Sequence, residues 1–259
     1  MSHVPRSVGR AAGGRLLAAV CLFACHSSPP TGAAMPPSAP HPPVTSHPVE
    51  GDATPPSTLR QRYGLHGPTA IAPARTALVL VDVQREFLDG QLRLPDSWAA
   101  VDRAQQLLAW ARGTGVGVVF VRQQAAAAGA PLFAPGSTGA ELAAGFDPRP
   151  DEIVITKSAA GAFSRTALHQ ILAERGIELL IIAGMMTHLA VDTTARDATV
   201  LGYRAVIAGD ATATRSLPGP HGDGIVDHAT LQRAALAALA DRFADIAATE
   251  EIIALPVRR

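Results

Sequence analysis

Two residues of opposite charge, Asp82 and Lys157, each stand at the end of an apolar run in this chain. Asp82 closes residues 76–82 (TALVLVD), and Lys157 follows residues 152–156 (EIVIT). A carboxylate beside an ammonium group in a partly dry pocket can hold or release a proton, which is the work of a general acid or base. The same residues could instead form a buried structural ion pair. Their spacing leaves both interpretations open.

The elements that must position these side chains follow from the hydrophobic pattern. Apolar runs typical of strands buried on both faces of a parallel sheet cover residues 76–82, 116–122, 152–156, 178–183 and 203–208, with a weaker sixth at 251–255. Helical patterns lie between them, over residues 98–112, 165–175, 190–201 and 229–245. This alternation predicts an α/β fold with helices on both faces of a parallel sheet. Because sites in such sheets lie beyond the carboxyl ends of the strands, Asp82 and Lys157 are expected to face one crevice.

The composition excludes some classes of function. The chain of 259 residues carries 22 basic and 22 acidic side chains, and this neutral balance argues against a nucleic-acid partner. Its two cysteines, Cys21 and Cys25, both lie near the N-terminus. The residues after Cys25 can therefore form neither a disulfide framework nor a thiolate metal site.

The N-terminal part differs in composition from the rest. Residues 1–25 resemble an export signal, in which arginines precede an apolar run too short to span a bilayer. That run ends in LFAC and resembles a bacterial lipobox with Cys25 as the lipidated residue; a signal peptide cut elsewhere and a start-site error are the alternatives. Residues 26–56 are rich in proline and predict a disordered tether, and residues 57–259 predict one globular domain. We therefore expect an exported protein on the periplasmic side of a bacterial membrane, attached through a lipid anchor only.

Three blocks of the sequence carry a resemblance to a known family. Residues 77–90 (ALVLVDVQREFLDG), 155–172 (ITKSAAGAFSRTALHQIL) and 181–214 (IIAGMMTHLAVDTTARDATVLGYRAVIAGDATAT) are similar to the isochorismatase-like hydrolases, which include cysteine amidohydrolases. The resemblance implies a three-layer, doubly wound, six-stranded parallel sheet. In the cysteine members it also implies a triad of Asp, Lys and Cys. Asp82 and Lys157 match the first two residues of the triad, and Ala190 stands at the nucleophile position.

The methyl group of Ala190 excludes thiolate catalysis, since it can neither ionise nor attack a substrate. Isochorismatases proper also lack the cysteine, and the resemblance implies that in them the Asp protonates a vinyl ether. One hypothesis is therefore a hydrolase that cleaves a C–N or vinyl-ether type bond of a small metabolite, with Asp82 as general acid or base and Lys157 as its partner. The other is a catalytically inactive relative that binds a small ligand or a partner at the cell envelope.

The resemblance also marks residues around this centre. Met185, Met186 and Thr187 match the stretch where the family has a cis peptide and backbone donors for an oxyanion, although the pattern also fits a plain turn. The candidates for substrate binding are Gln84, Phe87, Arg122, Phe163 and His188. Core packing competes for both phenylalanines, and packing or hydrogen bonding competes for His188.

No cofactor or metal site is expected. Nicotinamidases of the family bind a metal through Asp-x-His after the second strand, and residues 122–131 here read RQQAAAAGAP. Asp210 is expected to be a turn or cap residue. The expected partner is a small-molecule substrate or ligand, and the resemblance favours a homo-oligomer.

Overall fold

The computed structural model describes residues 56–258. The expected export signal, Cys25 and the expected tether, apart from Pro56, lie outside the described residues. Among the described residues, no helix is long and apolar enough to cross a membrane.

A six-stranded parallel sheet forms the centre of the domain, with the strand order β3-β2-β1-β4-β5-β8. Its strands are β1 (Thr76–Val81), β2 (Gly117–Gln123), β3 (Ile153–Lys157), β4 (Leu179–Met185), β5 (Arg204–Ala213) and β8 (Asp245–Ala247). The two central strands, β1 and β4, are buried along their whole length, as their continuous apolar runs predict. The chain moves outward from β1 in one direction and from β4 in the other. The sheet is therefore doubly wound, and the predicted fold class is confirmed.

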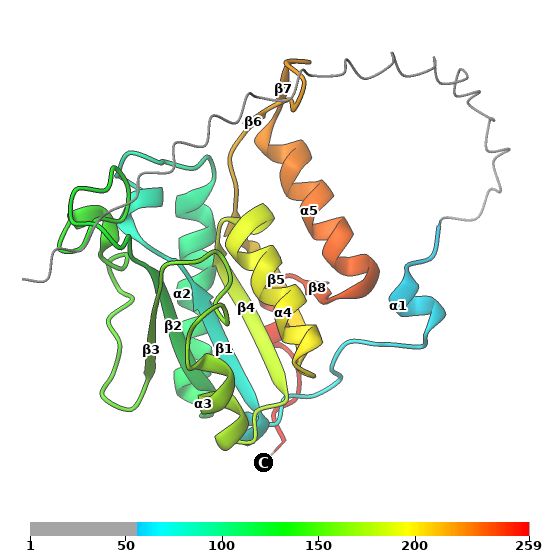
Figure 1. Cartoon of the computed structure of the whole chain (residues 1–259). Coiled ribbons are helices and arrows are strands. Elements are labelled where there is room, and N and C mark those ends of the chain that lie inside the picture. Colours follow the sequence, from blue (N-terminus) through cyan, green and yellow to red (C-terminus); the bar gives the residue numbers. More distant parts are fainter. Residues whose placement is uncertain (1–55, 259) are drawn as a thin grey trace, which may run out of the picture. The chain divides into compact units, whose positions relative to one another are not determined.

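Helices cover both faces of the sheet (Figure 1). The helices are α1 (Leu59–Arg62), α2 (Ser97–Thr114), α3 (Leu168–Glu174), α4 (Asp192–Val200), α5 (His228–Arg242) and α6 (Thr249–Ile253). On one face, α2 and α6 pack against side chains such as Leu80 and Phe120. On the other face, α3, α4 and α5 pack against the alternate residues, such as Val81 and Val121. Because successive side chains of each strand point to opposite faces of the sheet, the core is divided into two layers.

The sixth strand was predicted at the wrong place. Residues 251–255 lie mostly in α6, and the strand that completes the sheet is β8, just before it. Hydrogen bonds at the helix start explain this result, because Glu251 accepts from the backbone N–H of Ala248 at 2.7 Å and Asp210 accepts from that of Thr249 at 2.8 Å. Acidic side chains stabilise a helix N-terminus in this way. Asp210 was expected in a turn or cap after the fifth strand; it lies within β5 instead, and it supports the start of α6 from a distant part of the chain.

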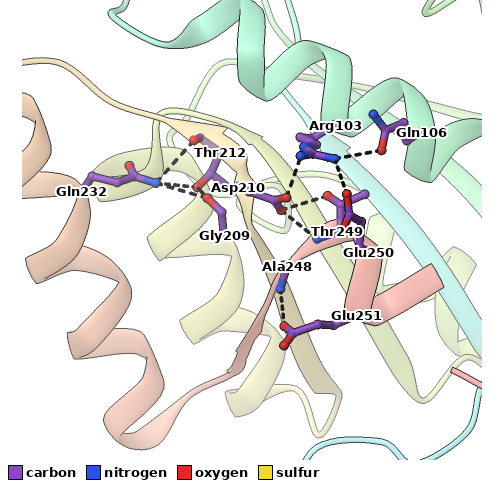
Figure 2. Close-up of polar contacts among 10 residues, drawn as sticks. All are labelled: Arg103, Gln106, Gly209, Asp210, Thr212, Gln232, Ala248, Thr249, Glu250 and Glu251. Carbon is purple, nitrogen blue, oxygen red and sulfur yellow. Dashed lines mark hydrogen bonds and ion pairs between the residues drawn. The ribbon is translucent and has the colours of Figure 1, made fainter. Parts of the chain in front are cut away.

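A bulge in β5 shapes the edge of the sheet where the site lies. The pairing with β4 moves from Ile182–Ile207 to Gly184–Thr212, so residues 208–211 bulge out of register. Figure 2 shows how the bulge is held: Asp210 lies between Arg103 of α2 and Thr249 of α6, and Gln232 of α5 reaches Thr212 from the other side. The bulge brings the end of β5 beside the end of β4.

A short hairpin of β6 (Leu217–Pro218) and β7 (Ile225–Val226) leads from β5 to α5. Short helical turns lie in the connections around the strands, one before β1, one after β1, one between β2 and β3 and one after β4. They are η1 (Pro73–Arg75), η2 (Arg85–Phe87), η3 (Thr138–Ala140) and η4 (Thr187–Val191), the last being a π-helix.

Candidate active site

Asp82 and Lys157 meet at the carboxyl end of the sheet. Lys157 Nζ donates to Asp82 Oδ2 at 2.6 Å, and the two side chains are only 1% and 4% exposed. Lys157 lies at the end of β3, and Asp82 follows β1 directly. The Lys157 ammonium also donates to Gln123 Oε1 at 2.9 Å and to the carbonyl of Ala159 at 3.2 Å. The three hydrogens of the ammonium group therefore each have an acceptor.

The backbone turns Asp82 out of the strand. Its φ is 50°, a left-handed value that is sparsely populated by residues with a Cβ. The N–H of Asp82 donates to the carbonyl of Val121 at 2.8 Å, and its carbonyl accepts from the N–H of Gln84 at the same distance. Such local strain is typical of functional sites, where the surrounding structure holds it in place.

The environment of the Asp82 carboxyl is dry. Burial raises the pKa of Asp82 from 3.8 to about 7, although the nearby Lys157 ammonium favours the charged form and opposes the rise. The carboxyl can therefore be protonated near neutral pH, and its Oδ1 is buried without a partner among the described residues.

A cavity of about 350 Å³ opens beside this ion pair. Its lining residues are Asp82, Phe87, Leu92, Gln123, Leu132, Phe133, Lys157, Ser158, Ala159, Ala160, Met186, Leu189 and Ala190. Polar groups gather around the ion pair, and the remaining wall is apolar, with the rings of Phe87 and Phe133 packed edge to face at 5.3 Å. An apolar cavity with a few converging polar groups is the usual form of a small-molecule site. Ala190 lies on its wall, so no bulky side chain closes the space next to Asp82.

The end of β4 forms another part of the wall. The peptide bond between Met185 and Met186 is cis, in the stretch where the family resemblance implies one. Gly184 has a φ of 125°, and a Cβ at this position would collide with the carbonyl of Val81, so the strand can turn here only with glycine. Met186 lines the cavity, whereas the side chains of Met185 and Thr187 are buried behind it.

Two of the residues expected to bind substrate are engaged elsewhere. Gln84 is fully buried, and its amide bonds to the backbone N–H and carbonyl of Gln123 and to the carbonyl of Ala140. Arg122 donates to Thr156 Oγ1 at 2.9 Å on the opposite face of the sheet edge and does not line the cavity. Gln84 therefore holds the loop beside the site. Its position after a strand suggested a binding role, but its amide turns inward.

Phe163 and His188 also lie off the cavity wall. Phe163 stacks on Tyr203 with ring centroids 5.8 Å apart, which is the core packing that competed with a binding role. His188 hydrogen-bonds through Nδ1 to Thr214 Oγ1, and burial together with the charge of Arg215 lowers its pKa. Of the five expected binding residues, only Phe87 lines the cavity.

Ser158 and Phe133 line the cavity but were not expected there, and Gln123, at the end of the second predicted strand, lines it although Arg122 was the expected binding residue. The signal for Gln123 was available in the sequence. Strand β2 alternates, so Gln123 shares the face of Val121, and it pairs in register with Lys157. Arg122 points to the other face for the same reason. Phe133 lies in an irregular loop, where no periodic pattern predicts which way its side chain points.

A second cavity of about 410 Å³ lies between the end of β5 and the start of α5. Its wall includes Thr212, Thr214, His228 and Gln232 but not the buried ion pair. Within the described residues, no group of three or more His, Cys, Asp or Glu side chains could hold a metal ion. Of these two cavities, only the first is lined by the buried pair of Asp82 and Lys157.

Comparisons with known proteins agree with this geometry. Residues 76–251 match the family model of the isochorismatase domain. The chain is 33% identical over 196 residues to a secreted isochorismatase effector of Verticillium dahliae, covering 76% of this chain and 99% of that one. It is 32% identical over 231 residues to a streptothricin hydrolase of Streptomyces noursei, covering 88% of this chain and 82% of the relative.

The crystal structure of an isochorismatase from Pseudomonas putida KT2440 is similar as well. It superimposes with a TM-score of 0.69 at 34% identity, over 76% of this chain and 98% of that chain. The doubly wound sheet, the ordered sequence blocks and these matches lead to one conclusion. The chain belongs to the isochorismatase family of hydrolases.

Proposed function

We propose that this protein hydrolyses a small metabolite without forming a covalent bond to it, with Asp82 as the proton-transfer residue and Lys157 as its electrostatic partner. The observation that supports the proposal is the buried ion pair of Asp82 and Lys157, both of which line a cavity of about 350 Å³. Ala190 supplies a methyl group on the wall, so water is the nucleophile of this reaction.

In the proposed reaction, the bond that breaks is a C–N bond. The Asp82 carboxylate removes a proton from water while the water oxygen bonds to the carbonyl carbon. The same carboxyl then returns that proton to the nitrogen, which leaves as an amine or ammonia. The products are a carboxylic acid and the amine, and Asp82 is again ionised. Lys157 holds Oδ2 throughout and stabilises the charge on the carboxylate.

Turnover by the full chain tests this proposal. The purified protein is incubated with a panel of neutral carboxamides, and ammonia release is followed. The native protein is expected to release ammonia, Asp82→Asn to abolish the release, and Arg122→Gln, which alters a side chain outside the cavity, to retain it. Turnover that survives Asp82→Asn would remove Asp82 from the mechanism.

A second candidate function is binding without catalysis. The observation that favours it is the methyl group of Ala190 at the position where the resemblance puts the nucleophile. This protein would then retain ligands in the same cavity and release no product. Saturable binding of a carboxamide with no turnover in the same preparation is the outcome that selects this candidate.

We also propose that the domain works outside the cytoplasm, held at the membrane by a lipid on Cys25. The support for this proposal is the pattern of residues 1–25. Replacing Cys25→Ser is expected to move the protein out of the membrane fraction, and unchanged attachment would contradict lipidation.

A further inference from the structure

Gln84 completes the sheet at the point where β1 ends and β2 continues. The left-handed backbone of Asp82 turns the chain away, and its carbonyl accepts from the N–H of Gln84 at 2.8 Å. In a regular parallel ladder that carbonyl would accept from the N–H of Gln123. The Gln84 side chain replaces the missing partner, since its Oε1 accepts from the Gln123 N–H at 2.7 Å and its Nε2 donates to the Gln123 carbonyl at 2.9 Å.

The Gln84 amide also holds the loop that follows β2. Its Nε2 donates to the carbonyl of Ala140 at 2.9 Å, and beside it residues 83–85 pair through their backbone with residues 141–143. The side chain is fully buried, and both hydrogens and the oxygen of its amide are bonded. An apolar side chain of the same size would leave three buried backbone groups without a partner, which is costly.

Gln123 connects this support to the ion pair. Its backbone pairs in register with Lys157 of β3, and its side-chain Oε1 accepts from the Lys157 ammonium at 2.9 Å. That ammonium donates to Asp82 at 2.6 Å, so a displacement of Gln123 removes an acceptor from the group that holds the carboxylate. Among residues 56–258, the Gln84 side chain bonds to neither member of the pair and does not line the cavity. The influence of this side chain on the pair therefore passes through Gln123.

We infer that Gln84 is a positioning residue: it holds the end of β2 so that Gln123 keeps the Lys157 ammonium against the Asp82 carboxylate. The inference rests on the proposed function for the role of this pair in proton transfer, but it concerns the geometry of the pair and not turnover. A glutamine that only stabilised the loop would affect the free energy of unfolding and leave the ion pair as it is. The two roles therefore differ in a property of Lys157 that can be measured.

Lys157 is the only lysine of the chain, so its side chain can be observed without interference from others. In the full chain grown with ¹³C-labelled lysine, a single ε-CH₂ group gives an NMR signal. Among the described residues that line the cavity, only Asp82 and Lys157 carry a charge, so the signal is expected to follow the titration of Asp82. Its midpoint is measured between pH 5 and 9, and in the native chain it is expected near the pKa of Asp82, which burial raises to about 7.

Gln84→Met removes the three hydrogen bonds of the amide and keeps the length of the side chain. Its midpoint is expected about one pH unit above the native one, because an ammonium group that is held less closely favours the carboxylate less. Gln105→Met is the matched control: Gln105 Nε2 donates to the carbonyl of Ala144 at 3.0 Å in the same connection between β2 and β3, and this amide does not line the cavity. The control is expected to titrate as the native chain does.

Gln123→Met tests whether the effect passes through Gln123. This change removes the Oε1 acceptor of Lys157 and leaves Gln84 in place, so a rise of similar size is expected. The double variant Gln84→Met/Gln123→Met is expected to rise no further than Gln123→Met alone, because the effects of two residues that act through one contact are not additive. Gln84→Asn, in which the amide is one CH₂ shorter, replaces Gln84→Met if that variant shows no cooperative thermal transition.

An unchanged midpoint in the folded Gln84 variant, an unchanged midpoint in Gln123→Met, or additive shifts in the double variant would each overturn the inference. None of these measurements needs a substrate, so the inference and the proposed function can fail separately. Shifted, non-additive midpoints in a chain that turns over no substrate would support the inference and contradict the proposed hydrolysis. Turnover by a chain whose midpoint does not respond to the change at Gln84 would do the reverse.

Discussion

Lys157 and Asp82 are 75 positions apart in the chain, yet the ammonium nitrogen of one lies 2.6 Å from a carboxylate oxygen of the other. Strands β1 and β3 are not neighbours in the sheet, because β2 lies between them. The contact forms because Lys157 extends across the end of β2, where Gln123 accepts its second hydrogen bond. The ion pair is therefore held across three strand ends.

Removing the cation of this pair is expected to destabilise the fold. Lys157→Met leaves a buried carboxyl without its partner, which typically costs about 3–5 kcal/mol of the free energy of unfolding. Urea denaturation at pH 8 measures this loss. The double variant Asp82→Asn/Lys157→Met is expected to recover part of it, because no uncompensated charge remains.

Arg85→Gln, which breaks an exposed pair with Asp89, is the control and is expected to leave the urea midpoint unchanged. A midpoint for Lys157→Met equal to the native one would contradict the buried pair.

The pH dependence of turnover is expected to follow Asp82. Burial raises its pKa to about 7, so the carboxylate is the minor form below that pH and the major form above it. If the carboxylate is the base, kcat/KM rises about tenfold per pH unit up to pH 7 and then levels off. An acid role in vinyl-ether cleavage gives the opposite profile, flat below pH 7 and falling above it. The profile measured between pH 5 and 9 therefore distinguishes the two reactions.

The ion pair could be predicted from the sequence because it depends on strand ends alone. Continuous apolar runs located β1 and β3, and the rule that sites lie at carboxyl ends brought Asp82 and Lys157 to the same edge. The alternation of side chains along β2 could also have shown that Gln123, and not Arg122, faces the site, since consecutive side chains of a strand point to opposite faces of the sheet.

Other features depend on tertiary contacts that no local pattern shows. Gln84 lies at a strand end like Asp82, but its amide turns inward to bond the backbone of Gln123 and Ala140. The segment 251–255 has strand-like residues, yet a carboxylate from β5, Asp210, caps a helix there. In both cases the deciding partner is distant in the chain, so a single-sequence pattern could not reveal it.

The bulge of β5 is expected to depend on Asp210. Asp210→Ala removes the acceptor of the Thr249 N–H and hydroxyl, bonded at 2.8 and 2.9 Å, and the partner of Arg103 at 3.5 Å. We expect a loss of about 1–3 kcal/mol in the free energy of unfolding, measured by urea denaturation. Glu250→Gln is a matched control, since its carboxylate contacts the same arginine but is 78% exposed, and it is expected to change stability little. Equal effects of the two variants would show that the bulge does not need Asp210.

Restoring a thiol at position 190 tests whether this cavity retains the geometry of the cysteine branch. In the background Cys21→Ser/Cys25→Ser, Ala190→Cys introduces the only thiol of the chain. Asp82 and Lys157 line the same cavity, so Asp82 can take the thiol proton and Lys157 can stabilise the thiolate.

A fall of about one unit in the pKa of this thiol raises its thiolate fraction about tenfold near neutral pH, and alkylation by iodoacetamide should accelerate accordingly relative to a free thiol. Adding Asp82→Asn should remove the acceleration, because the asparagine cannot accept the thiol proton. If the thiol reacts at the same rate with Asp82 and with asparagine, position 190 is not coupled to Asp82, and the assignment of Ala190 to the nucleophile position is wrong. If the rate depends on Asp82, hydrolysis of simple amides by the Ala190→Cys variant is the next expected result, since the attacking atom and its base are then both present.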